Sequence, residues 1–104
     1  MKAKIFFSAL ILTMLLSGCV GQNNEVDSPK DACIKKCNAE LAAGRDLSSG
    51  PCLSNEIAKN WVCDVAHSPR TAVDNEKKNQ CSSYGTTAAH FVEVTPDCSF
   101  IRAV

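Results

Sequence analysis

Six cysteines constrain the fold of this chain more than any other feature of its sequence. They are Cys33, Cys37, Cys52, Cys63, Cys81 and Cys98, which remain when the seventh cysteine, Cys19, is assigned to the N-terminal lipid site described below. An even number of cysteines in a short exported chain is typical of a disulfide framework. We therefore predict three disulfides, each contributing about 2–4 kcal/mol by restricting the unfolded chain. Six cysteines allow 15 pairings, and the sequence does not choose among them.

A structural zinc site is the rival interpretation of these cysteines. Such sites favour cysteines two to four residues apart, usually with a second pair of the same kind. Only Cys33 and Cys37 are that close, and the Cys-x-x-Cys motif of thiol-redox enzymes does not occur in the sequence. The spacing therefore favours disulfides.

The N-terminus predicts export and lipid anchoring. Lys2 and Lys4 precede an uncharged stretch over residues 5–16. This stretch is too short for a membrane-spanning helix of about 20 residues, but it suits the apolar region of a signal peptide. The run Leu16-Ser17-Gly18-Cys19 resembles the lipobox of prokaryotic lipoproteins, which implies cleavage after residue 18 and a diacylglycerol on the Cys19 sulfur. The competing interpretation is a plain secretory signal followed by a chance cysteine.

These observations divide the chain into three parts. Residues 1–18 are the predicted signal peptide, residues 19–28 the lipidated cysteine with a polar, flexible tether, and residues 29–104 the disulfide-stapled domain. Removal of residues 1–18 leaves nine Lys and Arg against eleven Asp and Glu, a formal charge of −2, with no basic run. We therefore expect no nucleic-acid partner. The expected location is the cell membrane or outer membrane, anchored by lipid and facing the extracytoplasmic side.

The predicted fold is a small, disulfide-rich α+β domain, with one N-terminal helix packed on a two- or three-stranded antiparallel sheet. Ser28 is a helix cap, Pro29 suits the first helical position, and Asp31 stands where a capping box places its acid. The helix is expected from Pro29 to about Ala43. Because two of its cysteines are four residues apart on one face, we expect them to reach two different partners.

The rest of the chain gives weaker structural patterns. Residues 55–60 are interpreted as a short helix that passes into an extended segment at Trp61. The stretch 70–80 is polar and mostly loop, with a helical turn after Asp74. Residues 88–95 are the best strand, and residues 99–104 are expected to add a short edge strand.

Two histidine–carboxylate pairs are the candidates for chemistry. Asp64 precedes His67 by three residues, and His90 precedes Glu93 by three. Together these four side chains suit a zinc or other divalent metal site, or an acid and a base for hydrolysis. The alternative is that they are ordinary surface groups, because such pairs arise often by chance. No other cofactor is expected.

Trp61 and Arg70 are the candidate binding surface. Trp61 suits either a ligand-stacking platform or, in a domain with so few large apolar residues, the core. Arg70 follows a proline and suits a clamp for a carboxylate or phosphate, or simply a solvated arginine.

Several strings of this sequence occur together in one known group. They are GPCLSN, WVCDVAHSPR, DN, NQC and AHFVEV. In these strings the chain resembles a group of uncharacterised, short, cysteine-rich exported lipoproteins of archaea and some bacteria. The resemblance covers most of the domain and implies no activity, but it directs attention to residues 61–70 and 89–94.

Two functions are consistent with the sequence. The first is a binding or structural module of the cell surface, whose partner is an envelope protein or a glycan, because a stapled surface loses little entropy on binding. The second is a metal-binding or metal-dependent hydrolytic domain built on the two histidine–carboxylate pairs. The sequence has neither a Gly-x-Ser-x-Gly elbow nor a phosphate-binding glycine loop.

Overall fold

The computed structural model describes residues 27–104, so the predicted signal peptide, the Cys19 lipid site and most of the predicted tether lie outside the described residues. The described part contains the helix α1 (Pro29–Ala42), the strands β2 (Cys52–Ala58), β3 (Trp61–Val65), β4 (His90–Val94) and β5 (Phe100–Ala103), and the 3-10 turns η2 (Ala72–Asn75) and η3 (Lys77–Asn79). None of the helices within residues 27–104 has the length and apolarity to cross a membrane.

The helix α1 begins where the sequence predicts. The Ser28 hydroxyl accepts a hydrogen bond from the backbone N–H of Asp31 at 3.1 Å, and Pro29 occupies the first turn. Only Cys33 and Cys37 of this helix are fully buried. The helix therefore owes its place on the sheet largely to its two cysteines.

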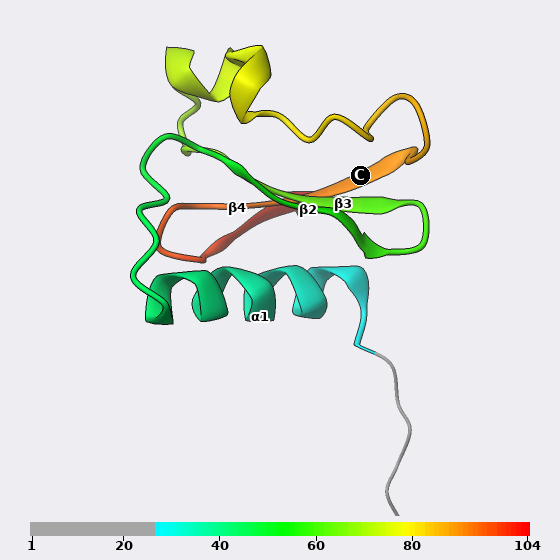
Figure 1. Ribbon diagram of the computed structural model, residues 1–104, viewed down its shortest axis with the longest axis horizontal. Helices are drawn as coiled ribbons and strands as arrows, with labels where there is room; N and C mark the ends of the chain where they lie inside the picture. The colour runs from blue at the N-terminus through cyan, green and yellow to red at the C-terminus, as the bar shows by residue number, and fades with distance from the viewer. Residues whose placement is uncertain (1–26) are drawn as a thin grey trace, which may run out of the picture.

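The four strands form one mixed sheet in the order β2-β3-β4-β5. The outer pairs are antiparallel, whereas β3 and β4 are parallel. The prediction of a two- or three-stranded antiparallel sheet was therefore wrong in strand number and direction. Parallel neighbours need a crossover connection of a dozen or more residues. Residues 66–89 provide it, and Figure 1 shows that they cover the face of the sheet opposite α1.

The helix predicted over residues 55–60 is also wrong, because residues 55–58 belong to β2 and residues 59–60 form a turn. The chain turns through Lys59 and Asn60, so that Ala58 pairs with Trp61 across a two-residue hairpin. Asn60 has a positive φ of 73°, a conformation that asparagine tolerates in such turns. The predicted strands near the C-terminus are confirmed as β4 and the edge strand β5, and the predicted turn after Asp74 as η3.

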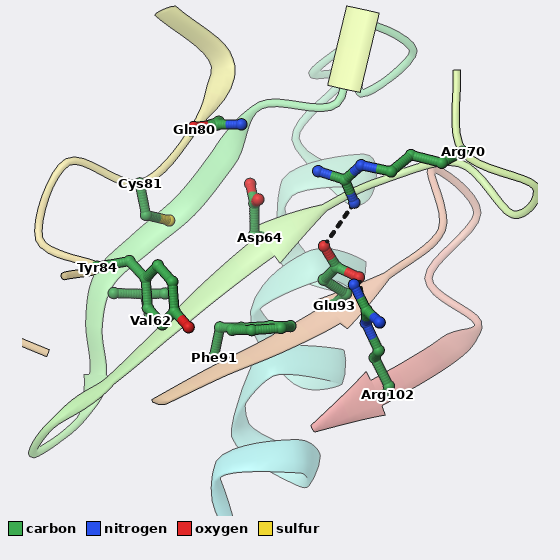
Figure 2. Close-up of a pocket in the computed structure, with 9 residues that line it drawn as sticks. All are labelled: Val62, Asp64, Arg70, Gln80, Cys81, Tyr84, Phe91, Glu93 and Arg102. Atoms are coloured by element: carbon green, nitrogen blue, oxygen red, sulfur yellow. Dashed lines mark hydrogen bonds and ion pairs between the residues drawn. The ribbon is translucent and has the colours of Figure 1, made fainter. Parts of the chain in front are cut away.

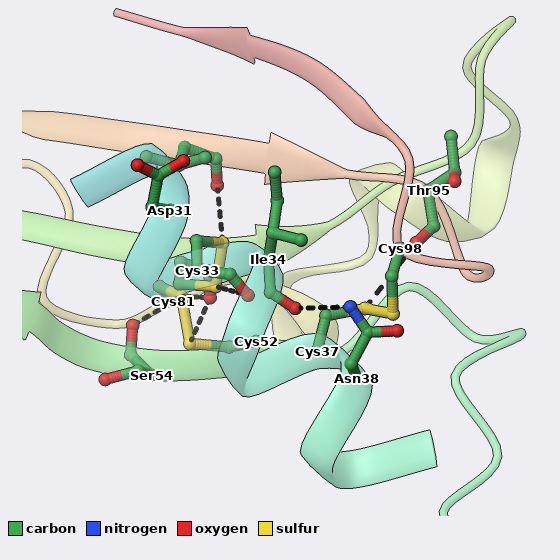
Figure 3. The surroundings of a disulfide bond; sticks show 12 residues. Asp31, Cys33, Ile34, Cys37, Asn38, Cys52, Ser54, Cys81, Thr95 and Cys98 are labelled. Atoms are coloured by element: carbon green, nitrogen blue, oxygen red, sulfur yellow. Dashed lines mark hydrogen bonds between the residues drawn. A yellow bond between two sulfur atoms is a disulfide. The ribbon is translucent and has the colours of Figure 1, made fainter. Parts of the chain in front are cut away.

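Three disulfides are present, as predicted. They join Cys33 to Cys63, Cys37 to Cys98, and Cys52 to Cys81. The two helix cysteines indeed have different partners, one in β3 and one in the turn between β4 and β5. Figure 3 shows the second of these pairs, Cys37 with Cys98. The third bond joins β2 to the crossover on the opposite face.

The sheet is consequently buried on both faces. Toward α1, the first two disulfides pack with Leu47, Val65, Val92 and Val94. Toward the crossover, a smaller cluster contains Val62, Cys81 and Ala88, with Cys52 and Phe91 partly buried beside them. Successive residues of a strand point to opposite faces of the sheet. The strand residues that do not face α1 therefore lie beneath the crossover.

Gly50 is expected to be the least replaceable glycine of the domain. An added Cβ would lie 2.5 Å from Asp74 Oδ1 and 3.1 Å from the Val65 carbonyl oxygen, and the residue has a φ of +70°. Gly44 is a matched control, since its φ is +87° but nothing lies within 4 Å of the added atom. In urea unfolding with the disulfides intact, Gly44→Ala should lower the free energy of unfolding by about 1 kcal/mol and Gly50→Ala by about 2–4 kcal/mol. Equal losses would contradict the close packing of Gly50.

Candidate functional site: a charged pocket beneath the crossover

A pocket of about 270 Å³ lies between the sheet and the crossover. Its lining, drawn in Figure 2, consists of Val62, Asp64, Arg70, Gln80, Cys81, Tyr84, Phe91, Glu93 and Arg102. The apolar and aromatic side chains gather on one side of the pocket and the charged ones on the other. The site is therefore two-sided, with an aromatic half and a charged half.

The parallel pairing of β3 and β4 creates the floor of this pocket. In their register Val62 pairs with Phe91, and Asp64 pairs with Glu93. These four side chains lie on the face of the sheet that the crossover covers, as two neighbouring pairs. β5 adds Arg102, which pairs with Glu93. The crossover supplies the wall, with Arg70 at its beginning and Gln80 and Tyr84 near its end.

The negative charge of Glu93 is balanced by two arginines. Its side chain is 7% exposed and accepts from Arg70 Nη1 at 2.9 Å and from Arg102 Nε at 3.0 Å. Arg70 also donates to Asn75 Oδ1 at 2.9 Å and to the Asp74 carbonyl oxygen at 3.3 Å. Charge-assisted bonds of this kind are stronger than neutral ones, so this network fixes the charged half of the pocket.

Asp64 is the less compensated carboxyl of the pocket. Its Oδ1 is buried and has no hydrogen-bond partner within residues 27–104. Burial, and next the neighbouring charge of Glu93, raise the pKa of Asp64 to about 7. A buried acceptor without a partner costs about 1–3 kcal/mol. Asp64 is thus the pocket carboxyl that changes charge near neutral pH and that gains most from a hydrogen-bond donor.

Asp74 holds the first part of the crossover in place. It is 2% exposed and accepts hydrogen bonds from the backbone N–H groups of His67 and Thr71 at 3.0 and 2.8 Å. It also contacts His67 Nδ1 at 2.9 Å and the Thr71 hydroxyl at 3.1 Å. Burial alone would raise the pKa of Asp74, but these hydrogen bonds lower it to about 2. The ionised Asp74 therefore stabilises the segment that carries Arg70.

The structure brings together only two of the four predicted metal ligands. Asp64 and Glu93 are neighbours, but His67 lies beyond the end of β3 and contacts Asp74. His90 pairs with Trp61 at the other end of β3 and stacks on its ring at 4.6 Å. Because His90 pairs with Trp61, which precedes His67 by six residues, the two histidines lie roughly 20 Å apart at the rise of a strand. Within residues 27–104 no three His, Cys, Asp or Glu side chains are grouped to hold a metal ion.

The two predicted binding residues lie on different faces of the sheet. Arg70 lines the pocket, whereas Trp61 is partly buried and packs against the core beneath α1. Sequence reasoning missed Gln80, Tyr84, Phe91 and Arg102 as site residues. Alternation along His90–Val94 places Phe91 on the face of Glu93, but nothing in the sequence indicates that Tyr84 or Arg102 reaches that face.

Comparisons with protein-family models, with curated proteins and with solved structures found no match.

The raised pKa of Asp64 predicts a distinctive pH dependence of stability. The folded chain keeps the Asp64 proton up to about pH 7, whereas the unfolded chain releases it near 3.8. This contribution to stability is complete below pH 3.8 and is lost as the pH rises to 7. Between pH 4.5 and 7.5 the free energy of unfolding of the wild type should fall, relative to that of Asp64→Asn, by about 3 kcal/mol. Parallel curves from denaturant unfolding at each pH would contradict the assignment.

Proposed function

We propose that this chain is a lipid-anchored, extracytoplasmic binding module whose ligand enters the pocket beneath the crossover. The observation that carries the proposal is the Asp64 carboxyl, which lines the pocket and has a buried Oδ1 without a hydrogen-bond partner, while its neighbour Glu93 accepts from two arginines. A ligand that donates a hydrogen bond to this carboxyl from the pocket would compensate part of the cost of its burial. Glu93 and Asp74 have partners that hold the fold together, whereas Asp64 has no such structural role.

The scaffold around the pocket supports binding. Cys81 lines the pocket and is bonded to Cys52 of β2, so the wall is covalently attached to the sheet. The other two disulfides fasten α1 to the opposite face. A pocket held in this way is ordered before the ligand arrives, which reduces the entropy lost on binding.

The extracytoplasmic location rests on two supports. Disulfides persist in oxidising compartments and are rare in the cytosol. The N-terminal segment has the layout of a signal peptide and a lipobox-like run that ends in Cys19. In this proposal the lipid holds the module at the membrane, and its partner is an envelope molecule, either a protein or a glycan.

Replacement of Cys19 tests the anchor. Intact mass spectrometry of the native protein from the membrane fraction should find a chain that begins at residue 19 and carries added lipid mass. Cys19→Ser should be released from the membrane or keep residues 1–18, because serine has no thiol for the lipid. Ser17→Ala keeps a small residue before the cleavage site and should behave as the wild type. Membrane retention of processed Cys19→Ser at the wild-type level would refute the anchor.

A further inference from the structure

The pocket offers hydrogen-bonding groups of both kinds. Asp64 Oδ1 is an acceptor without a partner. Arg102 uses only its Nε to bond Glu93, and its two Nη groups make no hydrogen bond within residues 27–104. The Gln80 amide makes one long contact, at 3.5 Å to the Asp74 carbonyl oxygen. A ligand in this pocket would therefore need to donate and to accept hydrogen bonds at short distances from each other.

The other half of the pocket is aromatic. Tyr84 and Phe91 meet edge to face, with their ring centroids 5.1 Å apart. Tyr84 is 47% exposed, so part of its surface is open to a ligand. Figure 2 shows Tyr84 and Phe91 beside Val62, across from Asp64. A ligand that reaches Asp64 would thus rest on an apolar surface.

The charges of the pocket favour a neutral ligand. Two arginines and two carboxyls line it, so its formal charge is zero when Asp64 is ionised. A cation would approach two guanidinium groups, and a simple anion would approach two carboxylates. The volume, about 270 Å³, is at the small end of ligand sites, which span about 300–1,000 Å³. The pocket therefore fits a single small ring rather than an extended chain.

We propose that this pocket binds a saccharide unit, whose hydroxyl groups donate to Asp64 and accept from Arg102 while its apolar face rests on Tyr84. This inference rests on the proposed binding function and specifies its ligand. A sugar hydroxyl is at once donor and acceptor, and a sugar ring also has an apolar C–H face. The sugar needs no charged group to bind, and this agrees with the equal numbers of arginines and carboxyls that line the pocket.

The proposal implies that binding strengthens as Asp64 ionises, since a carboxylate accepts stronger hydrogen bonds than a carboxylic acid. The charged groups that face Asp64 are Glu93 from β4, Arg102 from β5, and Arg70 and Asp74 from the crossover. Because the ligand donates to the Asp64 carboxyl, the part of the affinity change that comes from this group should disappear when Asp64 is replaced by an amide.

The test is saturation-transfer NMR and calorimetry on the detergent-solubilised mature chain. The probes are glucose, galactose, mannose and N-acetylglucosamine, with glycine and lysine as zwitterionic and cationic comparisons. At least one sugar should bind, more tightly at pH 8 than at pH 6. Asp64→Asn should weaken binding by about tenfold or more and abolish its pH dependence. Asp31→Asn, a carboxyl-to-amide change on α1 across the sheet, should leave binding unchanged.

A second pair of variants tests the aromatic surface without removing a buried group. Tyr84→Ala should weaken sugar binding markedly, whereas Tyr84→Phe keeps the ring and should retain most of it. Thiol counting checks that each variant keeps its three disulfides.

Three results would overturn the inference. Binding of glycine or lysine, with no sugar bound, would reject the saccharide but leave the proposed binding function standing. Failure of every probe, or sugar binding unaffected by both Asp64→Asn and Tyr84→Ala, would reject the saccharide site in this pocket. The Cys19→Ser experiment tests anchoring separately, so failure of the anchor is distinguishable from failure of the ligand assignment.

Discussion

Disulfides fasten both faces of a small sheet, and the remaining structure depends on this cross-linking. Two of them attach α1 to one face, and Cys52–Cys81 attaches the crossover to the other. The noncovalent core is thin, because its largest fully buried side chains are one leucine and four valines. A domain of this size seldom obtains enough stability from apolar burial alone. The covalent bonds make it possible to cover a polar pocket with a segment that has little regular structure.

The parallel pairing of β3 and β4 has the largest consequence for the site. It requires the long crossover, and it sets Asp64 beside Glu93 on the face that the crossover covers. The two carboxyls then differ sharply in environment. Glu93 forms ion pairs with both arginines. Asp64 has a buried oxygen that lacks a hydrogen-bond partner, and its pKa is raised to about 7. Our proposals for binding and for a saccharide ligand both follow from this asymmetry.

The limits of sequence prediction in this chain have physical causes. The capped helix, the strand around Phe91 and the three disulfides were predictable because local pattern and cysteine number determine them. Residues 55–60 were predicted as a helix because Ile57 and Trp61 stand four apart, but pairing with β3 overrides that pattern. Asp64 and Glu93 were predicted as metal ligands together with two histidines. The two carboxyls are neighbours, but the histidines lie at opposite ends of β3 and cannot join them. Arg102 and Tyr84 reach the pocket only through strand order and crossover path, which no local pattern encodes.

One disulfide holds the crossover over the sheet, and two others hold the helix. Peptide mapping of the unreduced, alkylated protein by mass spectrometry is the direct test of this pairing. We expect three linked pairs, Cys33 with Cys63, Cys37 with Cys98 and Cys52 with Cys81, and no alkylated cysteine among the six. Alkylation of Cys52 and Cys81, or a bond between either of them and a helix cysteine, would contradict it and would leave the pocket without its covalent wall.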